Sequence, residues 1–259
     1  MELYLLVGGL GLITGFLSGL LGIGGGIIMA PLLLFVPPLL GLPALPMHTV
    51  AGLTIVQSLL GCIVGAISHK EFEFVSGRLA WVMGVAVFVF AGLGALLSDS
   101  VSEGLLLMTF ATLAMVAAIL MLVPEPTTQE NPDVRTLDFS SPRAAGTAGL
   151  VGLLGGMVGQ GGSFLLIPAM TAFVHIPTRI AIGTNLVIVA ASSLAGTIGK
   201  AATGQIEWLL VLPIAISVMP AARLGSLTSR KLPVRILRKL LAILIAAAAL
   251  RLWWMVLAP

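Results

Sequence analysis

One glycine-rich apolar motif occurs twice in this chain of 259 residues, and the repetition constrains the fold more than any other feature. The first copy is residues 22–31, GIGGGIIMAP, and the second is residues 159–168, GQGGSFLLIP, 137 positions later. Further along each half the offset is 131, so that Gly52 corresponds to Gly183 and Gly65 to Gly196. The difference between 137 and 131, six positions, falls in the proline-rich stretch 36–48. A half-chain has therefore been duplicated, with a glycine cluster inside a hydrophobic segment of each copy.

Composition predicts that this repeat folds in a membrane. Hydrophobic residues make up 58% of the chain, charged residues make up 9%, and the mean hydropathy is +1.14. Because soluble proteins are typically about one quarter charged, a water-soluble domain could not bury so much apolar surface. We therefore predict an all-α polytopic membrane protein. The excess of 13 basic over 10 acidic residues is too small to suggest nucleic acid as a partner.

Each half is predicted to contain five helical elements. In the first half they span residues 3–21, 26–36, 50–68, 79–97 and 104–123. In the second half they span residues 144–158, 162–175, 180–200, 207–222 and 235–256. The second element of each half is too short to cross a bilayer alone. Residues 124–143 are polar and rich in helix breakers, which predicts a surface linker between a first transmembrane repeat, 1–123, and a second, 144–259.

Loop charges favour two inverted halves. The connection between the fourth and fifth elements is acidic in the first half, with Asp99 and Glu103. The equivalent stretch of the second half is basic, with Arg230, Lys231, Arg235, Arg238 and Lys239. The positive-inside rule places the basic stretch in the cytoplasm, whereas nothing holds the acidic one there. Each half would then cross the membrane an odd number of times: three full spans plus a glycine-centred pair, which either crosses twice or enters and returns.

The glycine triplets predict new helix starts at membrane depth. Glycine within a helix costs about 1 kcal/mol relative to alanine, and unwound backbone is tolerated in lipid only where protein or a water-lined cavity satisfies it. A break provides N–H groups without partners, at the positive end of a helix dipole. Two such starts could bind one small anion without a formal countercharge. The candidate residues are Gly24, Gly25 and Gly26 in the first copy and Gln160, Gly161, Gly162 and Ser163 in the second.

Close helix packing is the alternative role for glycine in a membrane helix. We assign that role to the glycines spaced three or four apart, which are Gly8, Gly11, Gly15, Gly19 and Gly22, and Gly146, Gly149, Gly152 and Gly155. For the contiguous triplets we favour a break, because consecutive glycines followed by a proline do not favour a continuous helix.

These motifs resemble those of the TauE/SafE sulfite exporter family, also described as the sulfonate uptake permease family. The resemblance rests on Gly22–Pro31, on the variant Gly159–Pro168 and on residues 181–186, AIGTNL, and it covers the whole chain. It implies an inner-membrane permease for sulfite, sulfonates or related small sulfur-containing or organic anions, with a direction that varies within the family. The chain departs from the pattern at Ser163, where the first copy has glycine, and this bears on the substrate rather than on the fold.

The third element of each half carries further candidates. Thr54 and Asn185 are equivalent under the 131 offset, Gln57 lies on the same helical face as Thr54, and Thr184 flanks Asn185. Polar side chains at this depth either line a substrate path or bond helices together. For Thr54, Gln57 and Asn185 both roles stay open. For Ser58, Ser192 and Ser193 we expect bonds to carbonyl groups of their own helix.

Charged residues are expected at the ends of the elements. Lys200 and Arg179 offer an electrostatic approach to the pore, and Arg223 is expected to extend towards the headgroups. His48, His69 and His175 are not spaced as metal ligands, so we expect no metal and no cofactor.

Three classes of function fit a doubled, broken-helix membrane repeat to different degrees. The first is a secondary anion transporter that works by alternating access, with a proton or sodium ion as the coupling ion and an oligomer as a possible state. The second is a passive anion channel that uses the same site. The third is an intramembrane serine protease, which we disfavour because no histidine lies within an apolar span to act as the base. No ATP-binding loop is present, so we expect ion gradients to supply the energy, and we predict that the protein is not an enzyme.

Overall fold

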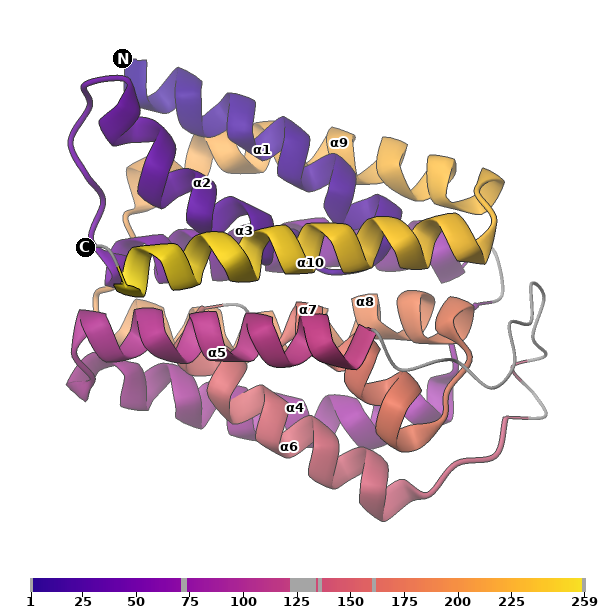
Figure 1. The fold of residues 1–259 in the computed structure, drawn as a ribbon. Helices are drawn as coiled ribbons and strands as arrows, with labels where there is room; N and C mark the ends of the chain where they lie inside the picture. Colours follow the sequence, from indigo (N-terminus) through magenta and orange to yellow (C-terminus); the bar gives the residue numbers. More distant parts are fainter. Residues whose placement is uncertain (1, 71–73, 122–133, 135–136, 160–161, 258–259) are drawn as a thin grey trace.

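The computed structural model describes residues 2–70, 74–121, 134, 137–159 and 162–257, which form an all-α bundle without a β-strand (Figure 1). The first half contains α1 (Glu2–Leu21), α2 (Gly26–Leu39), α3 (Met47–Lys70), α4 (Gly77–Leu97), the 3₁₀ turn η1 (Ser98–Ser100) and α5 (Glu103–Met121). The second half contains α6 (Ser141–Met157), α7 (Ser163–Ala169), the π-helical turn η3 (Met170–Val174), α8 (Thr178–Ala202), α9 (Trp208–Lys231) and α10 (Val234–Leu257). The predicted five helical elements per half are thus present.

The helices have the length and composition of membrane spans. Among the described residues, six helices are long and apolar enough to cross a membrane, namely α1, α3, α4, α5, α8 and α9. The helical stretches 26–39 and 163–174 are apolar but shorter, as expected for the two pieces that begin at the glycine clusters. The prediction of an all-α polytopic membrane protein is confirmed.

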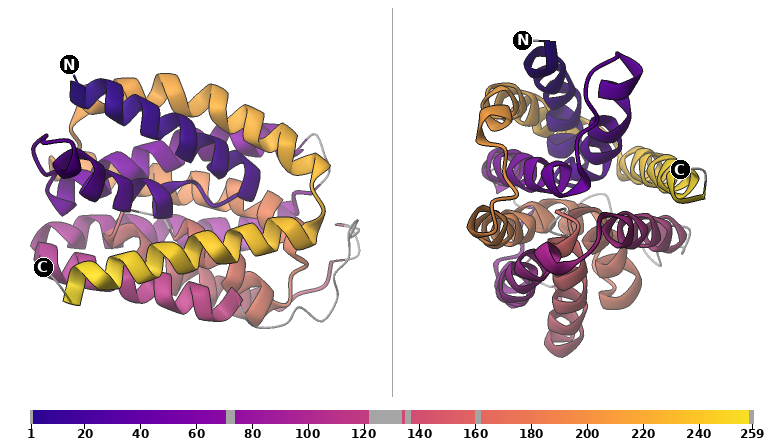
Figure 2. Two further views of the ribbon diagram at one scale, coloured as in Figure 1. Left: turned by 45° about the horizontal axis from the view of Figure 1, so that its top comes forward. Right: turned by 90° about the vertical axis from the view of Figure 1, so that its left-hand side faces the viewer.

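The fourth helix of each half packs against the first and third helices of the other half (Figure 2). Group A consists of α1, α3 and α9, and group B of α6, α8 and α4, so each group takes its first and third helices from one half and its fourth from the other. The two groups meet where α3 packs against α8. The fifth helices, α5 and α10, pack against each other, and they contact α7 and α2 respectively. The sequence halves are therefore interlocked rather than separate bodies.

Two pairs of corresponding helices run in opposite directions in Figure 1. In Figure 1, α1 runs from left to right and α6 from right to left, and the same opposition relates α5 to α10. Both N- and C-terminal ends of the chain lie at the left of that view.

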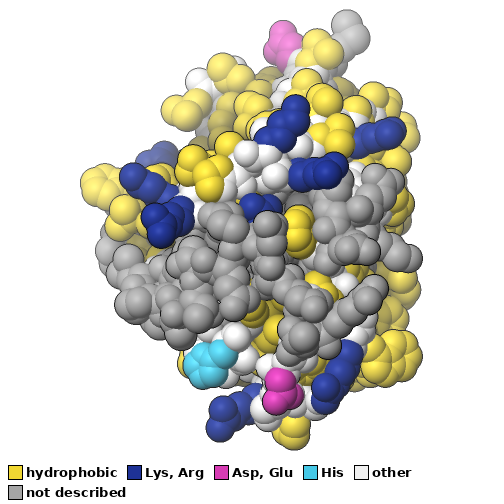
Figure 3. Space-filling view, turned by 90° about the vertical axis from the view of Figure 1, so that its right-hand side faces the viewer, with side chains coloured by type: hydrophobic (Ala, Val, Ile, Leu, Met, Phe, Trp, Pro, Cys, Tyr) yellow, Lys and Arg dark blue, Asp and Glu magenta, His cyan; other side chains and the backbone are white. Residues whose placement is uncertain are grey.

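The two ends of the bundle differ in charge. We call the end where α9 meets α10 the basic end; its exposed cations are Arg78, Arg143, Arg230, Lys231, Arg235 and Lys239. Figure 3 shows Lys and Arg side chains gathered on this face. We call the opposite end the acidic end; its exposed carboxylates are Glu2, Asp99, Glu103 and Glu207. On that side of the molecule the exposed Arg251 guanidinium lies 3.9 Å from the centroid of the Phe35 ring.

Glycines draw the helices of each group together. A β-carbon built on Gly15 would lie 2.8 Å from the α-carbon of Val218 in α9, and one on Gly152 would lie 3.1 Å from that of Val87 in α4. Because a side chain at either site would force the helices apart, these glycines serve close packing, as predicted. Gly146 has no atom within 4 Å of such a carbon, so the packing role predicted for it is wrong.

One helix boundary differs clearly from the sequence prediction. The fourth element of the second half was expected to end at residue 222, but α9 continues to Lys231. Arg230 and Lys231 occupy its last turn, where cations interact favourably with the negative end of the helix dipole. Arg223 consequently lies more than two turns inside the helix, with an exposed side chain.

Candidate functional site

The helix breaks occur at both glycine clusters. α1 ends at Leu21 and α2 begins at Gly26, and α6 ends at Met157 and α7 begins at Ser163. The residues that precede α2 and α7, Gly25 and Gly162, have φ angles of 75° and 76°. This left-handed conformation strains any residue with a β-carbon, which explains why glycine stands there in both copies. The prediction of a break, rather than of continuous packing helices, is confirmed.

Each break is held by the third helix of the other half. Asn185 Nδ2, from α8, donates a hydrogen bond of 2.6 Å to the carbonyl oxygen of Gly22. The hydroxyl of Thr54, from α3, lies 3.0 Å from the carbonyl oxygen of Gly159 and is placed to donate to it. Under the two offsets, Asn185 corresponds to Thr54 and Gly22 to Gly159, so one bond is repeated symmetrically.

Backbone contacts also connect each break to the third helix of the other half. A β-carbon on Gly22 would lie 2.7 Å from the carbonyl oxygen of Ile182, and one on Gly159 would collide with that of the equivalent residue, Ala51. Both glycines are therefore required for α3 and α8 to pass close to the breaks. The sequence left open whether Thr54 and Asn185 join helices or line a path, and these contacts give both of them a joining role.

Polar side chains without partners gather around the first break. A β-carbon on Gly24 would lie 3.2 Å from Ser163 Cβ and 3.3 Å from Ser58 Oγ, and one on Gly25 would meet the Gln57 amide and lie 3.2 Å from Ser18 Cβ. Within the described part of the chain, several buried atoms at this place lack a hydrogen-bond partner: Ser18 Oγ, Gln57 Nε2 and Oε1, Ser58 Oγ, Ser163 Oγ and Asn185 Oδ1. Since buried polar groups are normally paired, this cluster has capacity for a polar ligand. We call it the break cluster.

Three of the five side chains of the break cluster come from the first half. At the equivalent positions of the second half, Ser18 is replaced by Gly155, Gln57 by Ile188 and Ser58 by Val189. The second half contributes Ser163, the first residue of α7, and Asn185, which also donates 3.0 Å to the Ser163 carbonyl oxygen. The two copies of the motif thus form one site with unequal halves.

The break cluster is uncharged. In the part of the chain that the structure describes, the atoms nearest to a β-carbon at Gly22, Gly24 or Gly25 belong to neutral groups. Gly25, the N-cap of α2, has no side chain that could accept hydrogen bonds from the first amides of the helix, so the Gly26 and Ile27 amides remain available to a ligand. The structure thus combines N–H and O–H donors with a positive helix end and no countercharge.

Of the other predicted site residues, some lie at the breaks, one lies elsewhere and two are not described. The Thr184 hydroxyl accepts a hydrogen bond of 3.0 Å from the Ser76 amide at the start of α4, so it stabilises the α3–α4 connection instead of facing the break cluster. Gln160 and Gly161 lie outside the described residues. Gly26 and Gly162 lie at the breaks themselves.

Sequence reasoning missed part of the cluster. Ser58 and Ser193 were expected to bond within their own helices, but their hydroxyls have no partner among the described residues, so that expectation is wrong. Ser18 was not proposed as a ligand. Four residues earlier in α1, the Thr14 hydroxyl donates a hydrogen bond of 2.9 Å to the Leu10 carbonyl oxygen of its own helix. The sequence around Ser18 does not distinguish it from a serine that bonds in the same way.

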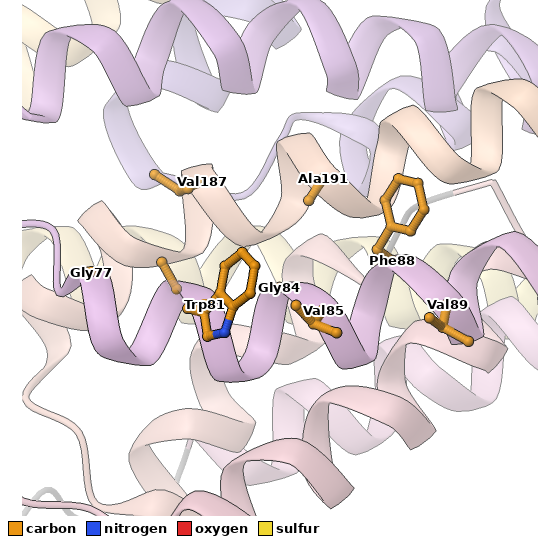
Figure 4. Close-up of a pocket in the computed structure, with 9 residues that line it drawn as sticks. Gly77, Trp81, Gly84, Val85, Phe88, Val89, Val187 and Ala191 are labelled. Atoms are coloured by element: carbon orange, nitrogen blue, oxygen red, sulfur yellow. The ribbon is translucent and has the colours of Figure 1, made fainter.

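A groove elsewhere in the structure has a different chemistry from the break cluster (Figure 4). It is a groove of about 420 Å³ between α4 and α8, lined by apolar or small residues such as Trp81, Phe88 and Val187. A further 320 Å³ continues along the same two helices past Leu93. These linings offer a polar solute no charge and few donors, so the groove differs in chemistry from the break cluster.

Comparison with known proteins agrees with this architecture. Residues 7–252 match the model of the family described as sulfite exporter TauE/SafE. A probable membrane transporter protein of Xylella fastidiosa (strain Temecula1) is 27% identical, over 95% of this chain and 93% of that protein. The probable membrane transporter protein YunE of Bacillus subtilis is 25% identical, over 86% of this chain and 87% of its own length. The corresponding protein MJ0441 of Methanocaldococcus jannaschii is 23% identical, over 93% and 91%. No solved structure matches.

The family match spans nearly the whole chain, including both glycine motifs and both third helices. With its apolar helices and its two interlocked halves, this multi-pass membrane protein belongs to the TauE/SafE sulfite exporter family of transporters.

Proposed function

We propose that this protein carries small sulfur-containing or organic anions of the sulfite or sulfonate type across the inner membrane by alternating access, driven by an ion gradient. The observation that carries the proposal is the break cluster, in which buried donors without partners surround the start of α2. A small oxyanion supplies the acceptors that these donors lack. The helix dipole favours its negative charge without a lysine or arginine at the same place.

The cluster also contains acceptors that need a donor or a cation. Gln57 Oε1 and Asn185 Oδ1 are buried and have no partner among the described residues. The O–H group of a protonated oxyanion, or a sodium ion, would satisfy them. This supports co-transport of a proton or sodium ion with the anion.

Alternating access is supported by the packing of the two helix groups. Groups A and B meet along α3 and α8, and the break cluster receives Gln57 and Ser58 from α3 and Asn185 from α8. A site built from both sides of such an interface changes its exposure when the two groups rock against each other. The moving bodies would then be groups A and B, each containing helices from both sequence halves.

The opposed helix directions and the unequal charges of the two ends support inverted halves, with the basic end in the cytoplasm. Two equivalent exposed residues test this orientation: Ser102 precedes α5, and Pro233, 131 positions later, precedes α10. In a background in which the buried Cys62 is replaced by alanine, we expect an impermeant maleimide applied outside intact cells to label Ser102→Cys but not Pro233→Cys. In inside-out vesicles the pattern should reverse. Labelling of both residues from one side would contradict the inverted arrangement.

A passive channel with the same site is the alternative, and accumulation against a gradient distinguishes the two. We expect purified protein in proteoliposomes to concentrate labelled sulfite several-fold above the external level when a proton or sodium gradient is imposed. A channel carries the anion only down its own electrochemical gradient, so the membrane potential is clamped with valinomycin and equal potassium on both sides. Equilibration without accumulation under either gradient would contradict the carrier.

A further inference from the structure

Lys200 places a buried positive charge near the acidic end of the bundle. It lies in the last turn of α8 and its side chain is 0% exposed. The ammonium donates hydrogen bonds to Ser98 Oγ at 2.9 Å and to Gln205 Oε1 at 2.8 Å. Both acceptors are neutral, and an ammonium has three N–H groups. A buried charge is normally paired with an opposite charge, so this one has unused capacity for an anion.

No carboxylate of the described residues takes that role. Asp99 acts on Lys200 through its electric field, but its side chain is exposed and forms no ion pair with the ammonium among the described contacts. The negative end of the α8 dipole does not account for the position of the ammonium either. The Lys200 side chain points across to Ser98 at the end of α4, while backbone amides of the following turn bond to the last carbonyls of α8.

The other groups around the ammonium are hydrogen-bonding side chains that can rotate. Gln205 Nε2 donates 2.8 Å to Thr203 Oγ1, and His48 Nδ1 lies 3.4 Å from Gln205 Oε1. An oxyanion that reached Lys200 could therefore also receive hydrogen bonds from the Gln205 amide and from the Ser98 and Thr203 hydroxyls. Together these residues form a cationic cluster with several donors.

A track of polar groups along α8 connects this cluster to the break cluster. From Asn185, the unpartnered hydroxyls of Ser193 and Thr197 and the ammonium of Lys200 follow after 8, 12 and 15 residues. At about 100° per residue, they fall within about 120° of one another around the helix, and the track is about 22 Å long. Polar groups on one side of a membrane helix mark the path of a polar solute.

A short turn covers the cationic cluster from the acidic end. Residues 203–205 fold back over the end of α8, with Gly204 exposed at a φ angle of 70°. The Gln205 carbonyl oxygen lies directly against Gly52 of α3, so this turn from the end of group B rests on group A. Separation of the two groups at this end would lift the turn and open the cluster.

We propose that Lys200 forms a second anion-binding site, near the acidic end of the molecule, which a small oxyanion occupies on its way to or from the break cluster. The proposal rests on the anion transport proposed above. The anion replaces the neutral partners of the ammonium when the covering turn moves away from α3.

The test is sulfite-dependent thermal stabilisation of the purified full-length protein, because a ligand stabilises the folded state according to its occupancy. The variants are Lys200→Gln, which keeps a hydrogen-bonding side chain but loses the charge, and Lys200→Arg, which keeps the charge. Gln57→Leu reports on the break cluster, and Lys231→Gln removes an exposed cation at the other end as a control for net charge. We expect wild type, Lys200→Arg and Lys231→Gln to show two saturable phases, and Lys200→Gln to lose one phase or weaken it at least tenfold.

Each outcome decides for or against the second site. If Lys200→Gln keeps both phases at wild-type affinity, or if the wild type is not stabilised by sulfite, the second site is refuted. If only Gln57→Leu alters binding, the second site fails and the break cluster stands. If only Lys200→Gln alters binding, the second site stands and the proposed role of the break cluster fails.

Discussion

Replacement of Gly25 by alanine is expected to reduce sulfite uptake to the background level. The residue has a φ angle of 75°, a conformation that costs a residue with a β-carbon about 1–2 kcal/mol. The added methyl group would also lie 2.6 Å from the Thr14 carbonyl oxygen and would run into the Gln57 amide. The start of α2 and the side chain beside it would both have to move. The measurement is the initial rate of sulfite uptake into proteoliposomes at equal protein content.

Gly41→Ala is the matched control for this change. Gly41 has nearly the same φ angle, 73°, but nothing lies within 4 Å of a β-carbon built on it. It therefore isolates the cost of the backbone conformation from the disturbance of the break cluster. We expect Gly41→Ala to transport sulfite at close to the wild-type rate. The unfolding temperature of both variants is measured alongside transport. Equal transport by the two variants would remove Gly25 from the site.

Replacement of Gln57 by leucine is expected to raise the KM for sulfite at least tenfold without a loss of stability. The Gln57 side chain is 0% exposed, and neither amide atom has a partner within the described structure. A buried polar group left unsatisfied costs about 1–3 kcal/mol, so leucine should leave the unfolding temperature unchanged or raise it. Loss of a hydrogen bond to a charged ligand costs about 1.5–3 kcal/mol, which corresponds to tenfold or more in affinity.

Thr54→Val is the counterpart on the same helix. The Thr54 hydroxyl contacts the carbonyl oxygen of Gly159, so its removal withdraws a donor from the second break. We expect a lower unfolding temperature and little change in the KM for sulfite. Thr54 and Gln57 lie less than one turn apart on α3, yet the first change should lower the unfolding temperature and the second should raise the KM. A destabilised Gln57→Leu with an unchanged KM would assign Gln57 to packing.

The helix breaks could be predicted from sequence because their cause is local. Three contiguous glycines, Gly24–Gly26, disfavour a continuous helix in any surroundings. The equivalent residues Gly161–Ser163 repeat this pattern in the second half. The approximate bounds of the membrane-spanning helices could be predicted from hydropathy because hydropathy is also a local property of each segment. The third-helix pair Thr54 and Asn185 was found from the 131 offset alone, and the structure gives both residues equivalent contacts.

The arrangement of the helices could not be predicted in the same way. A helix that is apolar on all sides has no amphipathic stripe that identifies its buried face, so nothing in the sequence indicates that α9 packs on α1 and α4 on α6. The unequal polarity of the two breaks depends on which side chains reach them, as Ser18 and Ser58 do. Lys200 shows the same limit, since the sequence predicted its position at a helix end but not the burial of its side chain.

The most direct test is to locate a bound anion. Selenite is a pyramidal oxyanion like sulfite, and its selenium atom can be located by anomalous diffraction from crystals of the full-length protein. We predict a peak at the first helix break, within hydrogen-bonding reach of the Gly26 amide and the Gln57 side chain. A peak beside Lys200 alone, or a selenite-saturated crystal with no density at the break, would contradict the claim that the start of α2 holds the transported anion.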